Sequence, residues 1–370
     1  MTHLMKILPV SALALAVTAC GGSSSSSDDT FTYDASDLIS NLTENVIVAG
    51  YYDLDSKAGD LIDALAVLQS NQSAATLQAA QEAWKAARQP WEQGEAHIFG
   101  PVDSLEIDPH LDSWPLNTND MATLVNQASP DFSSLNDDIQ GFHAMEYLLF
   151  GDGTTTNTRA ADLNTNELAY LAALSQAFEG YTDDLYQAWQ TSFESGAAYK
   201  TYLLNPGNEY YATNLAVMDE LINGMIGIVD EVANGKIADP FGTSAGNADT
   251  SLVESQYSWN SLTDFANNIR GVQNVYLGEF STNSDQQGIV DFVAAADTEL
   301  ASRIEEEIEA AIDAIENIGA DGSAAGMPFR AAITDTNGRV RIQAAIDALH
   351  TLYDSLHDDV LPLLNRWQSS

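Results

Sequence analysis

The chain has 370 residues with 54 acidic and 13 basic side chains, which gives a formal net charge of −41. This charge excludes a nucleic-acid binder and a polybasic membrane-binding patch, because nothing offsets the repulsion from phosphate groups. Hydrophobic residues make up 45% of the chain and charged residues only 18%, so a sizeable core can form. The length is typical of two domains of about 150–200 residues each.

The first 19 residues predict the signal peptide of a bacterial lipoprotein. Lys6 precedes an apolar run over residues 7–17 that is too short to span a bilayer. Small residues then lead to Cys20, the only cysteine, which excludes intramolecular disulfides and cysteine-based metal sites. We expect Cys20 to carry lipid, although an ordinary secretory signal with a chance cysteine is the alternative. Residues 20–30 form a serine-rich tether, and Gly21 after the cysteine favours an outer-membrane anchor facing the periplasm or the exterior.

Helical periodicity covers nearly all of the remaining chain. Apolar residues recur three or four positions apart over residues 61–68, 77–88, 139–150, 168–189, 215–232, 304–315 and 340–363. Ser73 is expected to cap the second of these helices, and Pro90 to interrupt or restart it. Alternating patterns of useful strand length are absent from the sequence, so an all-α protein built of helical bundles is predicted.

Two long irregular stretches, residues 100–119 and 236–254, break the helical pattern. Such loops inside compact bundles often carry function. We place the domain boundary near residues 205–207, which gives an N-terminal bundle over residues 31–205 and a C-terminal bundle over residues 206–370.

The most informative short segment contains His143 and Glu146. Three residues apart, they share one helical face with about 5–6 Å between their Cβ atoms, so one metal ion can bind both. Their neighbours are apolar, and a buried carboxylate needs a partner: a metal, an arginine or a hydrogen-bond network. A structural pair inside the core is the simpler alternative, and the spacing alone does not decide between them.

The segment GFHAMEYLLFG at residues 141–151 resembles the signature Gly-x-His-x-x-Glu of the imelysin family, which includes iron-regulated protein A. Further similar segments are residues 84–91 with Glu95, 99–103, 108–117, 254–261, 264–271 and 276–278. The resemblance covers residues 31–368. It implies two up-and-down helical bundles with a shared pocket at their interface.

The resemblance also implies the residues of that pocket. His143 and Glu146 would be metal ligands. The other residues expected to bind the ligand or cofactor are Arg88, Glu95, Trp114, Ser258 and Asp264. His97 stands where the family pattern predicts an apolar or aromatic residue; it is a ligand of this subgroup or, as we expect, a residue of the pocket rim. One histidine among several carboxylates suits iron, manganese or zinc.

Three classes of function follow. The first is an envelope lipoprotein that binds iron, another divalent metal or a small iron-bearing ligand for uptake, with an unknown uptake partner. The second is a metallopeptidase, the activity after which the family is named. The sequence lacks the motif His-Glu-x-x-His, so the question of enzymatic activity stays open. The third is a structural or interaction module whose polar network binds no metal.

Overall fold

A computed structural model describes residues 30–154, 159, 161–280 and 286–369 of the chain. The signal peptide, Cys20 and most of the predicted tether lie outside the described residues. No helix in the described ranges is long and apolar enough to cross a membrane.

The first half of the chain contains one short strand and a series of helices, the longest of which are α2, α3 and α8. Its elements are β1 (Phe31–Tyr33), α1 (Ser36–Asn41), η1 (Leu42–Val48), α2 (Ala49–Ser70), α3 (Ala74–Gly94), η2 (Glu95–His97), α4 (Pro101–Ser104), α5 (Ile107–Asp112), α6 (Thr118–Val125), η3 (Asp137–Ile139), α7 (Gly141–Phe150), α8 (Thr165–Gln190) and α9 (Lys200–Leu204).

The second half repeats this pattern of long helices joined by short ones and ends in a second short strand. Its elements are α10 (Asn214–Asp230), η4 (Glu231–Ala238), α11 (Asp239–Phe241), η5 (Thr250–Leu252), α12 (Ser261–Leu277), α13 (Ile289–Ala296), α14 (Thr298–Asn317), α15 (Phe329–Ala332), α16 (Thr336–Asp354), η6 (Ser355–Val360), η7 (Leu361–Asn365) and β2 (Trp367–Ser369).

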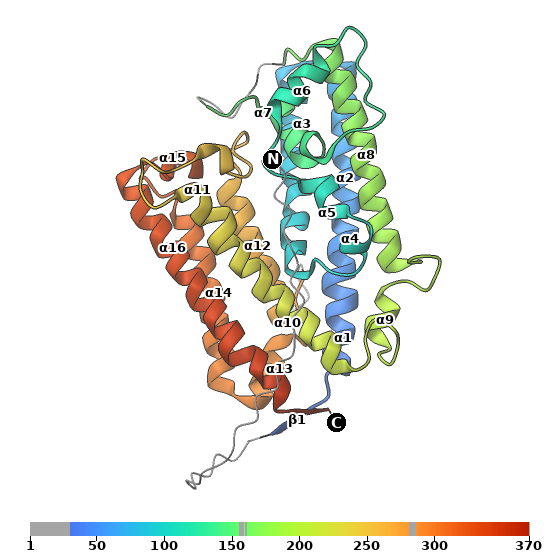
Figure 1. The fold of residues 1–370 in the computed structure, drawn as a ribbon, viewed down its shortest axis with the longest axis vertical. Coiled ribbons are helices and arrows are strands. Elements are labelled where there is room, and N and C mark those ends of the chain that lie inside the picture. Colours follow the sequence, from blue (N-terminus) through green and yellow to red (C-terminus); the bar gives the residue numbers. More distant parts are fainter. Residues whose placement is uncertain (1–29, 155–158, 160, 281–285, 370) are drawn as a thin grey trace, which may run out of the picture.

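The long helices form two bundles that stand side by side (Figure 1). Helices α2, α3, α7 and α8 pack together, as do α10, α12, α14 and α16. Helix α3 of the first bundle packs on α12 of the second, and η2 packs on α10 and α12, so several contacts join the halves. Gly271 makes the close approach feasible, because a Cβ atom there would lie 2.2 Å from the backbone oxygen of Gln93. The predicted boundary at residues 205–207 falls between α9 and α10.

The all-α fold class is confirmed, and local sequence signals explain many helix boundaries. Ser73 caps α3 as predicted, in a reciprocal pair of hydrogen bonds with Thr76. On α14, the buried stripe of Ile304, Ile308 and Ile312 matches the predicted apolar face.

Three local features differ from the expectations. Helix α3 continues through Pro90 to Gly94, because packing on both α2 and α12 offsets the lost backbone hydrogen bond. The stretch expected to be irregular over residues 100–119 contains the short helices α4 and α5, and that over residues 236–254 begins inside the π-helix η4. Strands β1 and β2 pair in parallel and join the two ends of the described chain.

Candidate functional site

The candidate site lies where α3 meets the second bundle. Arg88, Glu92 and Glu95 occupy successive turns of one face of α3 and the adjoining η2. All three side chains are buried. Their polar partners come from α5, η4, the segment before α12, and α12 itself. Helix α7 contributes His143, which lies beside Asp112.

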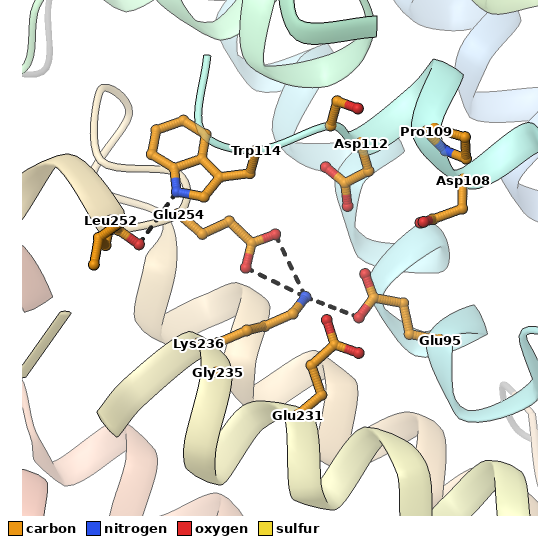
Figure 2. A pocket seen from close by; sticks show the side chains of 11 residues that line it. Glu95, Asp108, Pro109, Asp112, Trp114, Glu231, Gly235, Lys236, Leu252 and Glu254 are labelled. Carbon is orange, nitrogen blue, oxygen red and sulfur yellow. Dashed lines mark hydrogen bonds and ion pairs between the residues drawn. The ribbon is translucent and has the colours of Figure 1, made fainter. Parts of the chain in front are cut away.

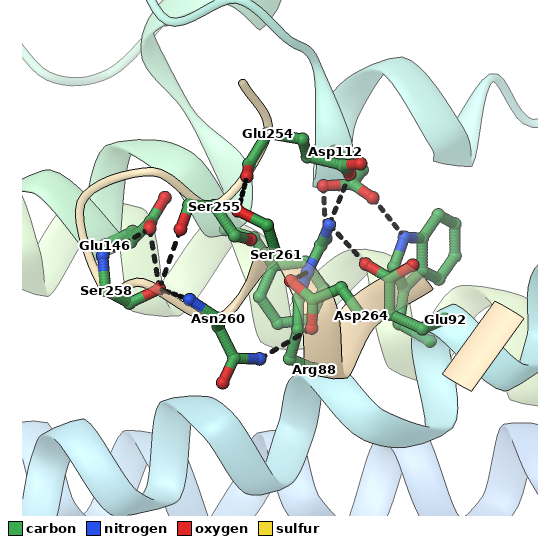
Figure 3. Close-up of polar contacts among 12 residues, drawn as sticks. Arg88, Glu92, Asp112, Glu146, Glu254, Ser255, Ser258, Asn260, Ser261 and Asp264 are labelled. Carbon is green, nitrogen blue, oxygen red and sulfur yellow. Dashed lines mark hydrogen bonds and ion pairs between the residues drawn. The ribbon is translucent and has the colours of Figure 1, made fainter. Parts of the chain in front are cut away.

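Arg88 is a fully buried cation held by four carboxylates (Figure 3). Its guanidinium contacts Glu92 and Asp112, and lies 2.6 Å from Oε1 of Glu254 and 3.4 Å from Oδ2 of Asp264. Burial alone would lower the pKa of Arg88, but Asp112, Glu92 and the other two carboxylates raise it well above its usual value. The positive charge is therefore permanent, and it links both halves of the chain.

His143 lies between two carboxylates. Its Nδ1 is 3.1 Å from Oε2 of Glu146, and its Nε2 is 3.0 Å from Oδ1 of Asp112. The ring of Trp114 packs edge-on against the imidazole with 4.6 Å between centroids. Burial alone would lower the pKa of His143, but the contacts with Asp112 and Glu146 raise it to about 9. At neutral pH the imidazole is thus charged, with both N–H groups facing carboxylates.

Glu146 is held by a loop from the second half. Its Oε1 accepts hydrogen bonds from the N–H of Tyr257 at 3.0 Å, and from the N–H and hydroxyl of Ser258, each at 2.7 Å. Ser255 and Trp259 have positive φ angles of 48° and 61°, which turns the loop so that successive N–H groups face the anion. The hydroxyl of Ser258 therefore contacts the carboxylate of Glu146, and only that carboxylate contacts the imidazole of His143. In serine hydrolases the hydroxyl contacts the imidazole directly, so this arrangement is not a catalytic triad of that kind.

Lys236 is a second buried cation. Its Nζ lies 2.8 Å from Oε2 of Glu95, 3.2 Å from Oε2 of Glu254 and 3.5 Å from Oε2 of Glu92. The amide of Asn268 donates to the same oxygens of Glu92 and Glu95, at 2.6 and 3.0 Å. Burial alone would lower the pKa of Lys236, but the three carboxylates raise it well above its usual value, so the ammonium stays charged.

A cavity of about 360 Å³ opens beside Lys236 and is lined by both halves of the chain (Figure 2). Its lining includes one ammonium and five carboxylates, those of Glu95, Asp108, Asp112, Glu231 and Glu254. Trp114 forms one wall and donates a hydrogen bond to the backbone oxygen of Leu252 at 3.2 Å. The size suits a small ligand, and the acidic lining selects for positive charge.

Carboxyl groups outnumber cationic groups in the buried cluster. Arg88, Lys236 and His143 face six carboxylates, whose side chains are at most 7% exposed: Glu92, Glu95, Asp112, Glu146, Glu254 and Asp264. Burial raises the pKa of Glu92 to about 8 and that of Asp264 to about 6, despite the nearby Arg88. The cluster therefore favours uptake of further positive charge, as protons or as a cation.

Two groups of side chains have the geometry of metal ligands. Asp112, His143 and Glu254 form one group, and Glu92, Glu95 and Asp112 form the other, with ligand atoms within 4.8 Å of one another in each. Oε2 of Glu254 is buried and accepts no hydrogen bond from the described residues, although Lys236 pairs with it electrostatically. Carboxylates with one imidazole fit iron, manganese or zinc.

The structure brings together all seven residues predicted for the site: Arg88, Glu95, Trp114, His143, Glu146, Ser258 and Asp264. Their roles as ligands stay predictions. Both oxygens of Glu146 already have hydrogen-bond partners. Within the pair of His143 and Glu146, the atom that faces the other carboxylates is therefore Nε2 of His143. His97 is not at the rim: it is buried in the first bundle, with Nδ1 3.1 Å from the hydroxyl of Tyr51.

Five further residues of the site received no individual role from the sequence: Glu92, Asp112, Lys236, Glu254 and Asn268. Glu92 had a detectable signal, because it follows Arg88 by four positions on one helical face. Lys236 and Glu254 bound the second predicted loop, but nothing in their spacing indicates that they meet Glu95.

The fold and site define a two-bundle helical protein with a buried ionic cluster beside an acidic cavity. The model of the imelysin peptidase family matches residues 47–356, so the chain belongs to the imelysin family. The chain is 29% identical to the iron-regulated protein A of Synechococcus elongatus over 328 residues, which covers 88% of this chain and 86% of that protein.

Solved structures share this fold. A crystal structure described as an iron-regulated protein A precursor, from Parabacteroides distasonis, matches with a TM-score of 0.76 and 28% identity, covering 90% of this chain and 95% of that one. An imelysin-like protein from Psychrobacter arcticum matches with a TM-score of 0.66, covering 89% and 95% of the two chains. Its identity of 13% supports likeness of fold alone.

Proposed function

We propose that the chain is an envelope lipoprotein that binds iron, as a cation or in a small iron-bearing ligand, in the cavity between its two bundles. The excess of buried carboxylates over cationic groups is the observation that carries this proposal. Burial disfavours the charged form of the surplus carboxyl groups, and a bound metal cation would stabilise that form.

The donor set supports a metal of intermediate hardness. In the proposed complex, His143 releases its Nε2 proton, and Asp112, His143 and Glu254 then supply two carboxylates and one imidazole, a combination suited to iron, manganese or zinc. Glu146 would orient the imidazole by accepting a hydrogen bond from Nδ1, as carboxylates commonly do for metal-binding histidines. The names of the relatives from Synechococcus elongatus and Parabacteroides distasonis refer to regulation by iron, which favours iron among these metals.

The envelope location rests on the sequence. In the proposed arrangement Cys20 carries lipid in the outer membrane, and the serine-rich tether lets the two bundles stand away from the bilayer. A location in the periplasm or at the exterior would place the acidic cavity where it can capture a cation for transfer to an uptake partner.

Elemental analysis of full-length protein purified without chelators tests the proposal. We expect stoichiometric metal, with iron dominant after growth in iron-containing medium. Glu254→Gln should lose most of this metal, because it removes the carboxylate that contacts both Arg88 and Lys236. The control Glu316→Gln alters an exposed ion pair with Arg270 and should retain it.

The proposal is wrong if the purified protein contains no metal and titration with Fe²⁺, Mn²⁺ and Zn²⁺ gives no binding. That outcome would favour the metal-free interaction module. Hydrolysis of peptides, abolished by Glu146→Ala, would instead favour the peptidase for which the family is named.

A further inference from the structure

The two buried cations of the site differ in their access to the cavity. The Arg88 side chain is 0% exposed and fixed by four carboxylates. Lys236 is 9% exposed and lines the cavity beside Glu231 (Figure 2). A lysine side chain is also a flexible stem with a compact charge, whereas arginine presents a rigid fork. Lys236 is therefore the cation that can move without opening the core.

The ammonium of Lys236 occupies a position suited to a metal cation. Carboxylate oxygens of Glu95, Glu254 and Glu92 surround Nζ at 2.8, 3.2 and 3.5 Å. Glu254 is a ligand of the proposed complex, and Glu92 and Glu95 belong to the second ligand group, which shares Asp112 with the first. Metal–carboxylate bonds of about 2.0–2.2 Å are shorter than these distances, so the ring of oxygens would contract around a metal ion. An ammonium and a metal cation would therefore compete for the same atoms.

Glu231 offers the displaced ammonium a second partner. Glu231 and Lys236 lie five residues apart in the π-helix η4, whose hydrogen bonds join residues i and i+5, so they are one turn apart. Both side chains line the cavity. The ammonium can thus exchange the buried ring of carboxylates for an exposed carboxylate that lines the same cavity.

We propose that Lys236 is a tethered competitor: it neutralises the ring of carboxylates until a multiply charged cation displaces it toward Glu231. This inference rests on the proposed binding of a metal cation. Because the ammonium is attached to the chain, its effective concentration at the ring is high, so free monovalent ions do not displace it. Coulomb attraction grows with ionic charge, so divalent and trivalent cations can. Lys236 would thereby set the preference of the site for multiply charged cations.

Calorimetric titration of metal-stripped, full-length protein with Mn²⁺ tests this role. We expect Lys236→Met to bind Mn²⁺ at least tenfold more tightly than the wild type, equivalent to about 1.4 kcal/mol. Sodium chloride should weaken binding to this variant more than choline chloride at equal ionic strength, because Na⁺ can now enter the ring. The control is Lys200→Met. Lys200 lies outside the cavity and forms an ion pair with Glu44 at 3.0 Å, so this variant should bind Mn²⁺ like the wild type.

Equal or weaker Mn²⁺ binding by Lys236→Met, with binding by the wild type intact, would overturn the competitor role alone. Absence of Mn²⁺ binding by both proteins would overturn the competitor role and the proposed metal function together. Lys236→Arg provides a second test if the methionine variant does not fold. Its guanidinium fork should hold the carboxylates more firmly and weaken Mn²⁺ binding several-fold; unchanged or tighter binding would contradict the inference.

Discussion

Replacing Arg88 by methionine should strongly destabilise the chain while changing little of its shape. Methionine fills much of the same volume but leaves four carboxylates without their shared cation, in a region where the Arg88 side chain is 0% exposed. Removal of one partner from a buried ion pair costs about 3–5 kcal/mol. We expect a loss at the upper end of this range, because Asp112 and Glu254 each come from a separate segment that Arg88 holds against α3.

Urea unfolding followed by circular dichroism measures this loss. Arg88→Lys should recover part of the stability, since a lysine restores the charge but contacts fewer carboxylates at once. Arg270→Met is the matched control: it breaks an exposed pair with Glu316 and should cost at most about 1 kcal/mol. A loss below about 1 kcal/mol for Arg88→Met would refute the view that this buried cation is a main link between the two halves.

The other predictions concern the interface, the anchor and the site. Gly271→Ala should cost about 1–3 kcal/mol in unfolding experiments, because its Cβ would meet the backbone oxygen of Gln93, whereas Gly180→Ala, with open space around it, should not destabilise. Cys20→Ser should move the protein from membranes to the soluble fraction; normal processing and continued membrane association would contradict the anchor. Glu146→Ala should weaken metal binding about tenfold, or about 1.4 kcal/mol, with the helical spectrum nearly intact. A lower melting temperature with unchanged metal binding would instead assign Glu146 a purely structural role.

Helices were predictable because their signals are local. The stripe of Ile304, Ile308 and Ile312 sets the buried face of α14 without reference to the rest of the chain. The pairing of β1 with β2 was not predictable, because it depends on where distant ends of the chain meet. The break expected at Pro90 does not occur for a related reason: packing on α2 and α12 outweighs the local cost of proline in a helix.

The residues of the site likewise divide into those with a local sequence signal and those without one. His143 and Glu146 were predictable from a three-residue spacing among apolar neighbours, combined with a family resemblance. Lys236 was not, because its contact with Glu95 spans 141 positions in the sequence and arises only from the packing of the two bundles. Surface and site carboxylates are also hard to distinguish in a chain with 54 acidic residues, so the sequence does not single out Glu254.

Anomalous X-ray scattering at the iron edge, from crystals of iron-loaded protein, tests the central proposal most directly. We predict one strong peak at the buried cluster, about 2.0–2.2 Å from carboxylate oxygens of its two ligand groups, with Lys236 turned toward Glu231. A peak confined to surface carboxylates, or no peak beside Asp112, His143, Glu92, Glu95 and Glu254, would contradict the proposal.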